Sequence, residues 1–358
     1  MKNLINILKF AVFGFCCSSC ADLDIPSDGR VSLNEIFNRY ERTSAYYTNC
    51  LGFIPQVGFT YESTNTPLAS FCDEAHDASD NQDGPVSKWY KGYTTAEYNP
   101  LTASYIDPWS HYFQGIRRCN TFLECIRDPE IATYEFDEIE KNGWIAQVRV
   151  ARAFYYLQLI KRYGGVPIIK VPQEYDESNP SALLVNRSTE EATYEFILED
   201  LDNAIAMLPP TRSSREKYRI NRYAAAALKS RAMLYAASIA KYGSYDKNGL
   251  VGFDDPSKAE KYYKEVIKAV DVVREGGYSL YRGNADKAKN YQEMFWIKGD
   301  CPEVIFVKKY EYPDKAHNWD LWNQPWGYRY PDGYGSRLSP TLDLIEAFPM
   351  ADGTSGGF

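Results

Sequence analysis

The hydrophobic pattern of this chain is mainly that of amphipathic helices, in which apolar residues recur every three or four positions. The clearest case is the segment 144–163, which keeps its basic residues off the apolar stripe. Gly164 and Gly165 follow it, and glycine adopts the left-handed conformation of a helix C-cap without strain. Pro167 disfavours helix at the residue before it. The pattern therefore predicts a helix that ends at this turn; its stripe consists of Val148, Ala151, Tyr155 and Leu159.

Further helices are predicted from the same periodicity and from start and stop signals. Ser32 with Glu35, and Ser188 with Glu191, have the spacing of capping boxes. Small residues recur every four positions in 223–242, which predicts close packing against a neighbouring helix. Two apolar, β-branched segments, 166–171 and 303–308, are predicted to be short strands. The predicted helices cover approximately 33–47, 109–126, 192–208, 223–242 and 257–273, and the small-residue seam consists of Ala224, Leu228, Ala232, Ala236 and Ala240.

These elements predict a mostly all-α fold. Helices paired across short breaks are typical of tetratricopeptide-like pairs stacked in a superhelix. No strict tetratricopeptide pattern repeats at a fixed period, so the residues alone leave an irregular α-solenoid and a bundle both open. Long aromatic-rich loops and minor strands complete the predicted scaffold.

Composition and net charge limit the classes of function that this protein could have. The chain has 358 residues, 44% of them hydrophobic and 15% aromatic, with a formal net charge of −8. A folded body is expected, and 30 Tyr and 7 Trp are too many for all the rings to lie in a core, which favours a recognition surface. Nucleic-acid binding is not expected, because it needs a basic footprint.

The N-terminus is typical of an exported lipoprotein. Residues 1–19 contain Lys2 and a short apolar segment, which fits a signal peptide and is too short to span a bilayer. Ser18 and Ser19 precede Cys20, as in a bacterial lipobox, although Cys17 replaces the usual Leu. Lipidation at Cys20 is expected. Residues 20–31 would then be an acidic tether, and 32–358 the folded domain.

The cysteines predict neither a closed disulfide set nor a thiolate metal site. Five remain after the signal and Cys20, an odd number, and none of them forms a CxxC pair. Most are expected to be small core residues. The five are Cys50, Cys72, Cys119, Cys125 and Cys301.

Signals for catalysis and cofactors are poor. The chain has 3 His and none of the HExxH, GxSxG, P-loop or GxGxxG motifs. The acidic segment 73–83 lacks the glycine and glutamate that an EF-hand loop requires, so a solvated loop is expected there. No enzyme activity, metal or cofactor is expected. A glycoside hydrolase needs only two suitably spaced carboxylates, which a sequence does not reveal.

The segment 318–334 is the strongest candidate for ligand binding. Its indoles lie among Pro, Gly, Asn and Asp, which is loop composition. Exposed indoles can stack on the apolar faces of sugar rings, while polar side chains meet the hydroxyls. The alternative is a hydrophobic lid over the helices. The candidate residues are Trp319, Trp322, Asn323, Gln324, Trp326 and Arg329.

Five ordered blocks of the chain resemble the SusD/RagB family of surface lipoproteins. They are FCDEAHD with KWYKGYTTAEYNP, WSHYFQGIRRCNTFLECI, the helix ending in Gly-Gly-Val-Pro with NRSTEEATYEFILEDLDNAIAMLP, RINRYAAAALKSRAMLYAA, and LSPTLDLIEAFPMADG. The resemblance implies a tetratricopeptide-like scaffold that captures glycans at the outer membrane and delivers them to a TonB-dependent, SusC-like transporter. It adds ligand contacts from the N-terminal loop, at Asp73, Asp80, Trp89 and Tyr90. Family members normally continue past the last block, so the chain is expected to lack their C-terminal part.

Two alternatives remain open. One is a surface glycoside hydrolase on a helical scaffold, and the other is a peptide-binding or structural helical-repeat adaptor. The identity of any ligand lies beyond the sequence.

Overall fold

The computed structural model describes residues 31–54, 72–77, 109–210, 219–297, 301–311, 313–314, 338–354 and 356, and these are mostly helical. Two short strands, β1 and β2, accompany the helices. In chain order the elements are α2 (Leu33–Phe37), α3 (Tyr40–Leu51), β1 (Ala75–Asp77), α5 (Trp109–Cys125), α6 (Glu138–Tyr163), the 3₁₀ turn η2 (Pro180–Leu183), α7 (Glu190–Met207), α8 (Arg222–Tyr242), the 3₁₀ turn η4 (Pro256–Lys258), α9 (Ala259–Arg274), α10 (Lys287–Trp296), β2 (Leu338–Pro340) and α12 (Leu342–Ala347).

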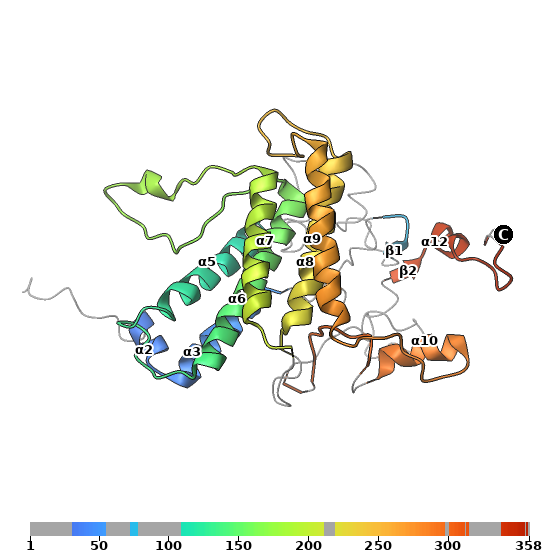
Figure 1. Ribbon diagram of the computed structural model, residues 1–358, viewed down its shortest axis with the longest axis horizontal. Coiled ribbons are helices and arrows are strands. Elements are labelled where there is room, and N and C mark those ends of the chain that lie inside the picture. Colours follow the sequence, from blue (N-terminus) through green and yellow to red (C-terminus); the bar gives the residue numbers. More distant parts are fainter. Residues whose placement is uncertain are drawn as a thin grey trace, which may run out of the picture.

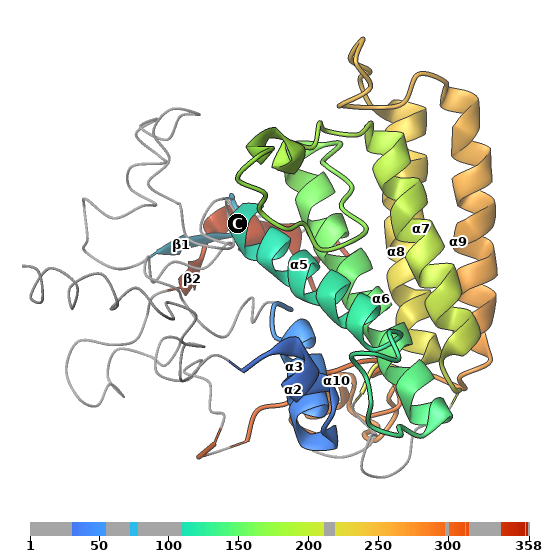
Figure 2. The same ribbon diagram turned by 90° about the vertical axis from the view of Figure 1, so that its left-hand side faces the viewer.

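Helices α5 to α9 stand side by side in chain order, each packed against the next (Figures 1 and 2). Helix α3 packs across α5 and α6. The strands and α12 lie to one side of this stack, and α10 lies on the same side, beneath α12 in Figure 1. The seam on α8 is confirmed, since Ala224, Ala232, Ala236 and Ala240 are all buried between neighbouring helices. The predicted all-α, tetratricopeptide-like fold is therefore correct.

Tyrosine supplies much of the core, which the sequence interpretation underestimated. Tyr47, Tyr155 and Tyr156 are fully buried, and each hydroxyl has a partner that offsets the cost of burying it. Tyr47 donates to Gln147 Oε1 at 2.7 Å, and Tyr155 donates to the Cys50 carbonyl at 2.5 Å. Burial raises the pKa of Tyr156 to about 12. Many rings are therefore structural, and abundance alone does not indicate a recognition surface.

The Gly-Gly-Val-Pro turn joins the ends of α6, α7 and α8. Gly164 ends α6 as predicted, but its φ of +68° and ψ of −144° are not those of a left-handed cap; they lie in a region that essentially only glycine adopts. The N–H of Gly165 donates to the Leu250 carbonyl at 2.8 Å. A Cβ atom at Gly165 would lie 2.1 Å from the Ser188 carbonyl oxygen. The glycines are thus required by close backbone approach as well as by the turn.

Glu190, in the first turn of α7, makes the same junction sensitive to pH. Its carboxylate is 4% exposed and accepts the Gly252 N–H at 2.6 Å. Burial raises the pKa of Glu190 above its ordinary value of 4.5, although the Gly252 hydrogen bond opposes the shift. The folded state therefore binds this proton more tightly than the unfolded chain, and the contribution of Glu190 to stability falls as pH rises above 4.5.

We expect Glu190→Gln to gain stability relative to the wild type as pH is raised from 4.5 through the folded pKa. The reason is that glutamine carries no charge to desolvate. Urea unfolding of both proteins at pH 4.5 and pH 7 measures this difference. A stability difference that does not change with pH would show that burial of the Glu190 charge has no cost.

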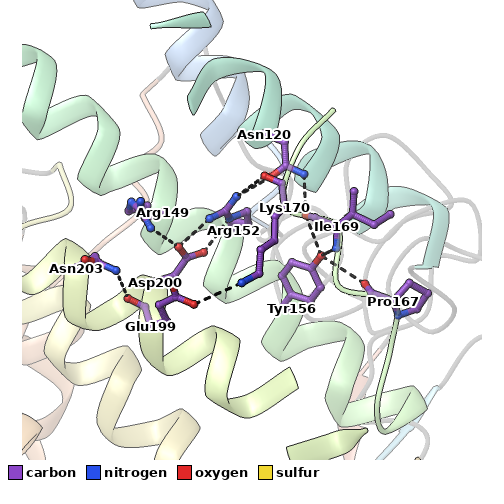
Figure 3. A network of polar contacts seen from close by, with 10 residues as sticks. All are labelled: Asn120, Arg149, Arg152, Tyr156, Pro167, Ile169, Lys170, Glu199, Asp200 and Asn203. Atoms are coloured by element: carbon purple, nitrogen blue, oxygen red, sulfur yellow. Dashed lines mark hydrogen bonds and ion pairs between the residues drawn. The ribbon is translucent and has the colours of Figure 1, made fainter. Parts of the chain in front are cut away.

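A buried polar network ties α5, α6 and α7 together (Figure 3). Asp200 on α7 accepts two hydrogen bonds from Arg152 on α6, both at 2.8 Å, and a third from Arg149 at 2.8 Å. Arg152 also donates to Asn120 Oδ1 on α5 at 2.7 Å, and Asn120 donates to the Ile169 carbonyl at 2.8 Å. Burial disfavours the charge of Arg152, but its bonds with Asp200 outweigh this and raise its pKa.

Two local predictions were wrong. No strand is assigned in segment 166–171 or in segment 303–308. Side chains hold the first one instead, because the Ile169 N–H donates to the Tyr156 hydroxyl at 2.8 Å and Arg117 donates to the Gln173 carbonyl. The second error concerns α7, whose N-cap is Thr189 and not Ser188.

Four of the five remaining cysteines lie in the core, as predicted. All five remaining cysteines are free thiols, so none of them is paired in a disulfide. Cys50, Cys119, Cys125 and Cys301 are buried, as expected of small core residues, and Cys72 is exposed. Burial raises the pKa of Cys125 to about 11, which keeps this thiol protonated at neutral pH.

Candidate functional site

The strands β1 and β2 form an antiparallel ladder beside the helical stack (Figure 2). Ala75 faces Pro340, His76 faces Ser339 and Asp77 faces Leu338. The strands are separated by residues 78–337, most of the length of the chain. The ladder is therefore a tertiary contact that brings together two distant parts of the chain.

Thr341, directly after β2, extends the ladder by two hydrogen bonds. Its N–H donates to the Glu74 carbonyl at 3.1 Å, and its hydroxyl donates to the Asp73 carbonyl. The same hydroxyl accepts the Leu344 N–H at 3.2 Å and so caps α12. Hydrogen-bonded and non-hydrogen-bonded residue pairs alternate along an antiparallel ladder. Because Thr341 is hydrogen-bonded to Glu74, the next pair, Ala75 and Pro340, is a non-hydrogen-bonded one. Pro340 therefore fits without leaving a ladder donor missing.

The ladder joins the flanks of the two segments that the sequence singles out for ligand binding. Strand β1 lies near the start of segment 73–90. The tryptophan-rich segment 318–334 ends four residues before the first residue of β2. Sequence reasoning missed this pairing. Strands of three residues carry too few positions to show the alternation that identifies a strand.

Of the candidate ligand residues, the structure describes Asp73 alone. Its side chain is exposed, and its carbonyl accepts the Thr341 hydroxyl. The predicted lipidation site Cys20 and the other candidates lie outside the described residues. These candidates are Asp80, Trp89, Tyr90, Trp319, Trp322, Asn323, Gln324, Trp326 and Arg329.

The described residues also show an exposed aromatic group that the sequence interpretation missed. On α10, Tyr291, Phe295 and Trp296 are each about two-thirds exposed, at 67%, 66% and 66%. The rings of Tyr291 and Phe295 meet edge to face, with centroids 5.2 Å apart. An i, i+4 spacing places these two on one helix face, a signal that could have been found in the sequence.

Described residues line two hollows. The first, of about 270 Å³, lies between α5 and the extended segment after Pro167, with Trp109, Phe113 and Arg117 in its lining. The second, of about 450 Å³, lies between α6 and α8 and includes Phe154 and Arg231. Both are mainly apolar.

Neither a metal cluster nor a membrane span is found among the residues that the structure describes. In these ranges no three His, Cys, Asp or Glu side chains group in a way that could hold an ion. Of the acidic segment 73–83, only its first five residues are described. Within the same ranges no helix is long and apolar enough to cross a bilayer.

Comparison with known proteins identifies the scaffold. The model of the SusD-like family described as "Starch-binding associating with outer membrane" matches residues 53–234, just over half of the chain. A SusD-like protein from Bacteroides fragilis is 29% identical with a TM-score of 0.67, and the match covers 91% of this chain and 57% of that one. No curated protein sequence matches.

Two more distant structures show the same fold. A SusD-like carbohydrate-binding protein from Bacteroides fragilis is 19% identical, with a TM-score of 0.63 and coverage of 90% of this chain and 55% of that one. A laminarin-binding SusD-like protein is 21% identical, with a TM-score of 0.52 and coverage of 68% and 47%. The chain thus spans about half the length of these solved structures. With the family model matching half of its residues, the chain belongs to the SusD-like family.

Proposed function

We propose that this protein binds a glycan at a surface formed by the two segments that the β1–β2 ladder joins. The observation that carries the proposal is the ladder itself, because it ties the flanks of segments 73–90 and 318–334 together in a member of a starch-binding family. One ligand could then contact both segments, although they are far apart in the sequence.

The residue types in the two segments suit sugar recognition. Trp319, Trp322 and Trp326 would offer flat apolar faces for stacking, and Trp89 and Tyr90 would add rings from the other segment. Hydroxyl groups of a sugar need planar polar partners, which Asn323, Gln324 and Arg329 would provide. The carboxylates of Asp73 and Asp80 would accept hydrogen bonds from the ligand. Neither a metal nor a cofactor is needed for binding of this kind.

We propose that binding is not followed by cleavage. The family is described by its binding of starch, and the sequence contains none of the catalytic motifs considered above. Equilibrium titration against a panel that includes starch and laminarin, with chromatography of the same samples, tests both parts. Saturable binding with unchanged glycan is expected. Cleavage that disappears when one carboxylate is replaced would establish a glycoside hydrolase instead.

We further propose that Cys20 is acylated and anchors the protein at the outer surface. The family association with the outer membrane supports this location. A single acyl chain binds membranes only marginally, so two or more chains are expected. Mass spectrometry of the mature protein should show a lipid on Cys20, and Cys20→Ala should abolish it. An unmodified N-terminus in the wild type would contradict the proposal.

The final step proposed is transfer of the glycan to a SusC-like, TonB-dependent transporter. It rests on the family alone. Co-purification of the lipidated protein with such a transporter from the native membrane is expected, and consistent recovery of the protein without any transporter would count against it.

A further inference from the structure

The hollow of about 450 Å³ between α6 and α8, called here the inner cavity, is distinct from the β1–β2 ladder. None of the lining residues that the structure describes belongs to the ladder. Helix α6 contributes Val150, Ala151 and Phe154, and the segment 303–306 forms another wall. The remaining lining residues are Ile54, Ile220, Ala224, Ala227, Leu228 and Arg231.

The cavity follows from the small residues of α6 and α8. Residues 224, 227, 228 and 231 recur at helical spacing and so share one face of α8. Alanine at 151, 224 and 227 leaves space there that larger side chains would fill. The volume lies within the range of about 300 to 1,000 Å³ found for small-molecule sites. The apolar walls favour a ligand with an apolar body.

The positive charge of Arg231 at the cavity determines which polar group the ligand should carry. Arg231 lines the cavity, is exposed, and makes no hydrogen bond or ion pair with any residue that the structure describes. Glu303, the acidic residue of the lining, already accepts the Tyr281 N–H at 2.7 Å. Lys161 adds positive charge near Arg231. The pKa of Lys161 is lowered mainly by burial and, to a smaller extent, by the charges of Arg162 and Arg231. A guanidinium without a partner is suited to a carboxylate.

We propose that the inner cavity binds a small amphiphilic carboxylate, with its apolar chain or ring between α6 and α8 and its carboxylate on the Arg231 guanidinium. The described lining residues of this site do not include any residue of the β1–β2 ladder. It gives the protein a second ligand of different chemistry.

Isothermal titration of the wild-type protein tests the proposal, with dodecanoate below its critical micelle concentration and dodecanol below its solubility limit. Dodecanoate should bind about tenfold or more tightly than dodecanol, because a hydrogen bond to a charged group contributes about 1.5 to 3 kcal/mol. Arg231→Met keeps the apolar stem and removes the charge, so it should abolish this preference. Arg274→Met, at an exposed arginine of α9 that pairs with Asp271, is the matched control and should bind as the wild type does.

Two further variants test the location. Ala227→Phe fills the cavity and should abolish binding of both probes, with a melting temperature measured alongside. Val304→Asp, at a lining residue that is 44% exposed and so tolerates a polar side chain, should weaken dodecanoate more than dodecanol. Equal binding of the two probes, no binding of either, or an unchanged preference in Arg231→Met and Val304→Asp would each overturn the proposal.

Discussion

Asp200→Asn is expected to destabilise the protein by about 3 to 5 kcal/mol, the usual cost of removing one partner of a buried ion pair. Asp200 is 1% exposed and is hydrogen-bonded to both Arg152 and Arg149. Asparagine keeps the shape of the side chain but leaves two guanidinium groups without their anion. Because Arg152 also donates a hydrogen bond to Asn120 on α5, the substitution should weaken the contacts among α5, α6 and α7. Urea unfolding measures the destabilisation.

The neighbouring residue provides the matched control (Figure 3). Glu199 pairs with Lys170 at 3.8 Å, with side chains 59% and 63% exposed. Exposed ion pairs contribute about 0 to 1 kcal/mol, so Glu199→Gln should change the free energy of unfolding little. If Asp200→Asn cost no more than Glu199→Gln, the buried network would not be what fixes α5, α6 and α7.

Gly164→Ala is expected to cost about 2 to 6 kcal/mol, the sum of backbone strain in a conformation that favours glycine and overpacking. Gly164 has φ +68°, and a Cβ atom there would lie 2.2 Å from the Leu250 carbonyl oxygen. That oxygen belongs to the backbone and accepts the Gly165 N–H, so it cannot move away as a flexible side chain would. The junction of α6, α7 and α8 would have to shift.

Substitution of Gly277 allows the cost of a positive φ to be measured without the cost of a steric clash. Its φ is +69°, but a Cβ atom there would meet nothing within 4 Å. Gly277→Ala should therefore show the cost of a positive φ without any clash, about 1 to 2 kcal/mol. Thermal unfolding of the two variants compares them. Equal losses would mean that close approach to Leu250 adds nothing to the requirement for glycine at position 164.

The helices were predictable from the sequence because their signals are local. The Ser32–Glu35 capping box is present as predicted, and α6 ends at Gly164 as its residues indicate. The start of α7 was misjudged by one residue for a tertiary reason. The Ser188 N–H donates to the Val166 carbonyl at 3.1 Å, which keeps Ser188 extended beside the α6 exit and leaves Thr189 to cap the helix.

The β structure and the site depend on contacts that local patterns do not contain. Segments 166–171 and 303–308 have strand-like residues but lie among helices, where the first is bonded by side chains of α5 and α6. The actual strands form because Ala75–Asp77 meets Leu338–Pro340 across most of the sequence. Composition identified the tryptophan-rich segment, whereas its link to β1 needed the three-dimensional structure.

The most direct test of the glycan surface is the affinity of Trp319→Ala, Trp322→Ala and Trp326→Ala for the tightest glycan of the panel, measured with their melting temperatures. Trp296→Ala is the matched control, since Trp296 is 66% exposed on α10 and outside both ligand segments. At least one of the three should lose about 1 to 3 kcal/mol of binding at an unchanged melting temperature, while Trp296→Ala keeps full affinity. Three variants with lowered melting temperatures and wild-type affinity would contradict the account, because the indoles would then form a lid.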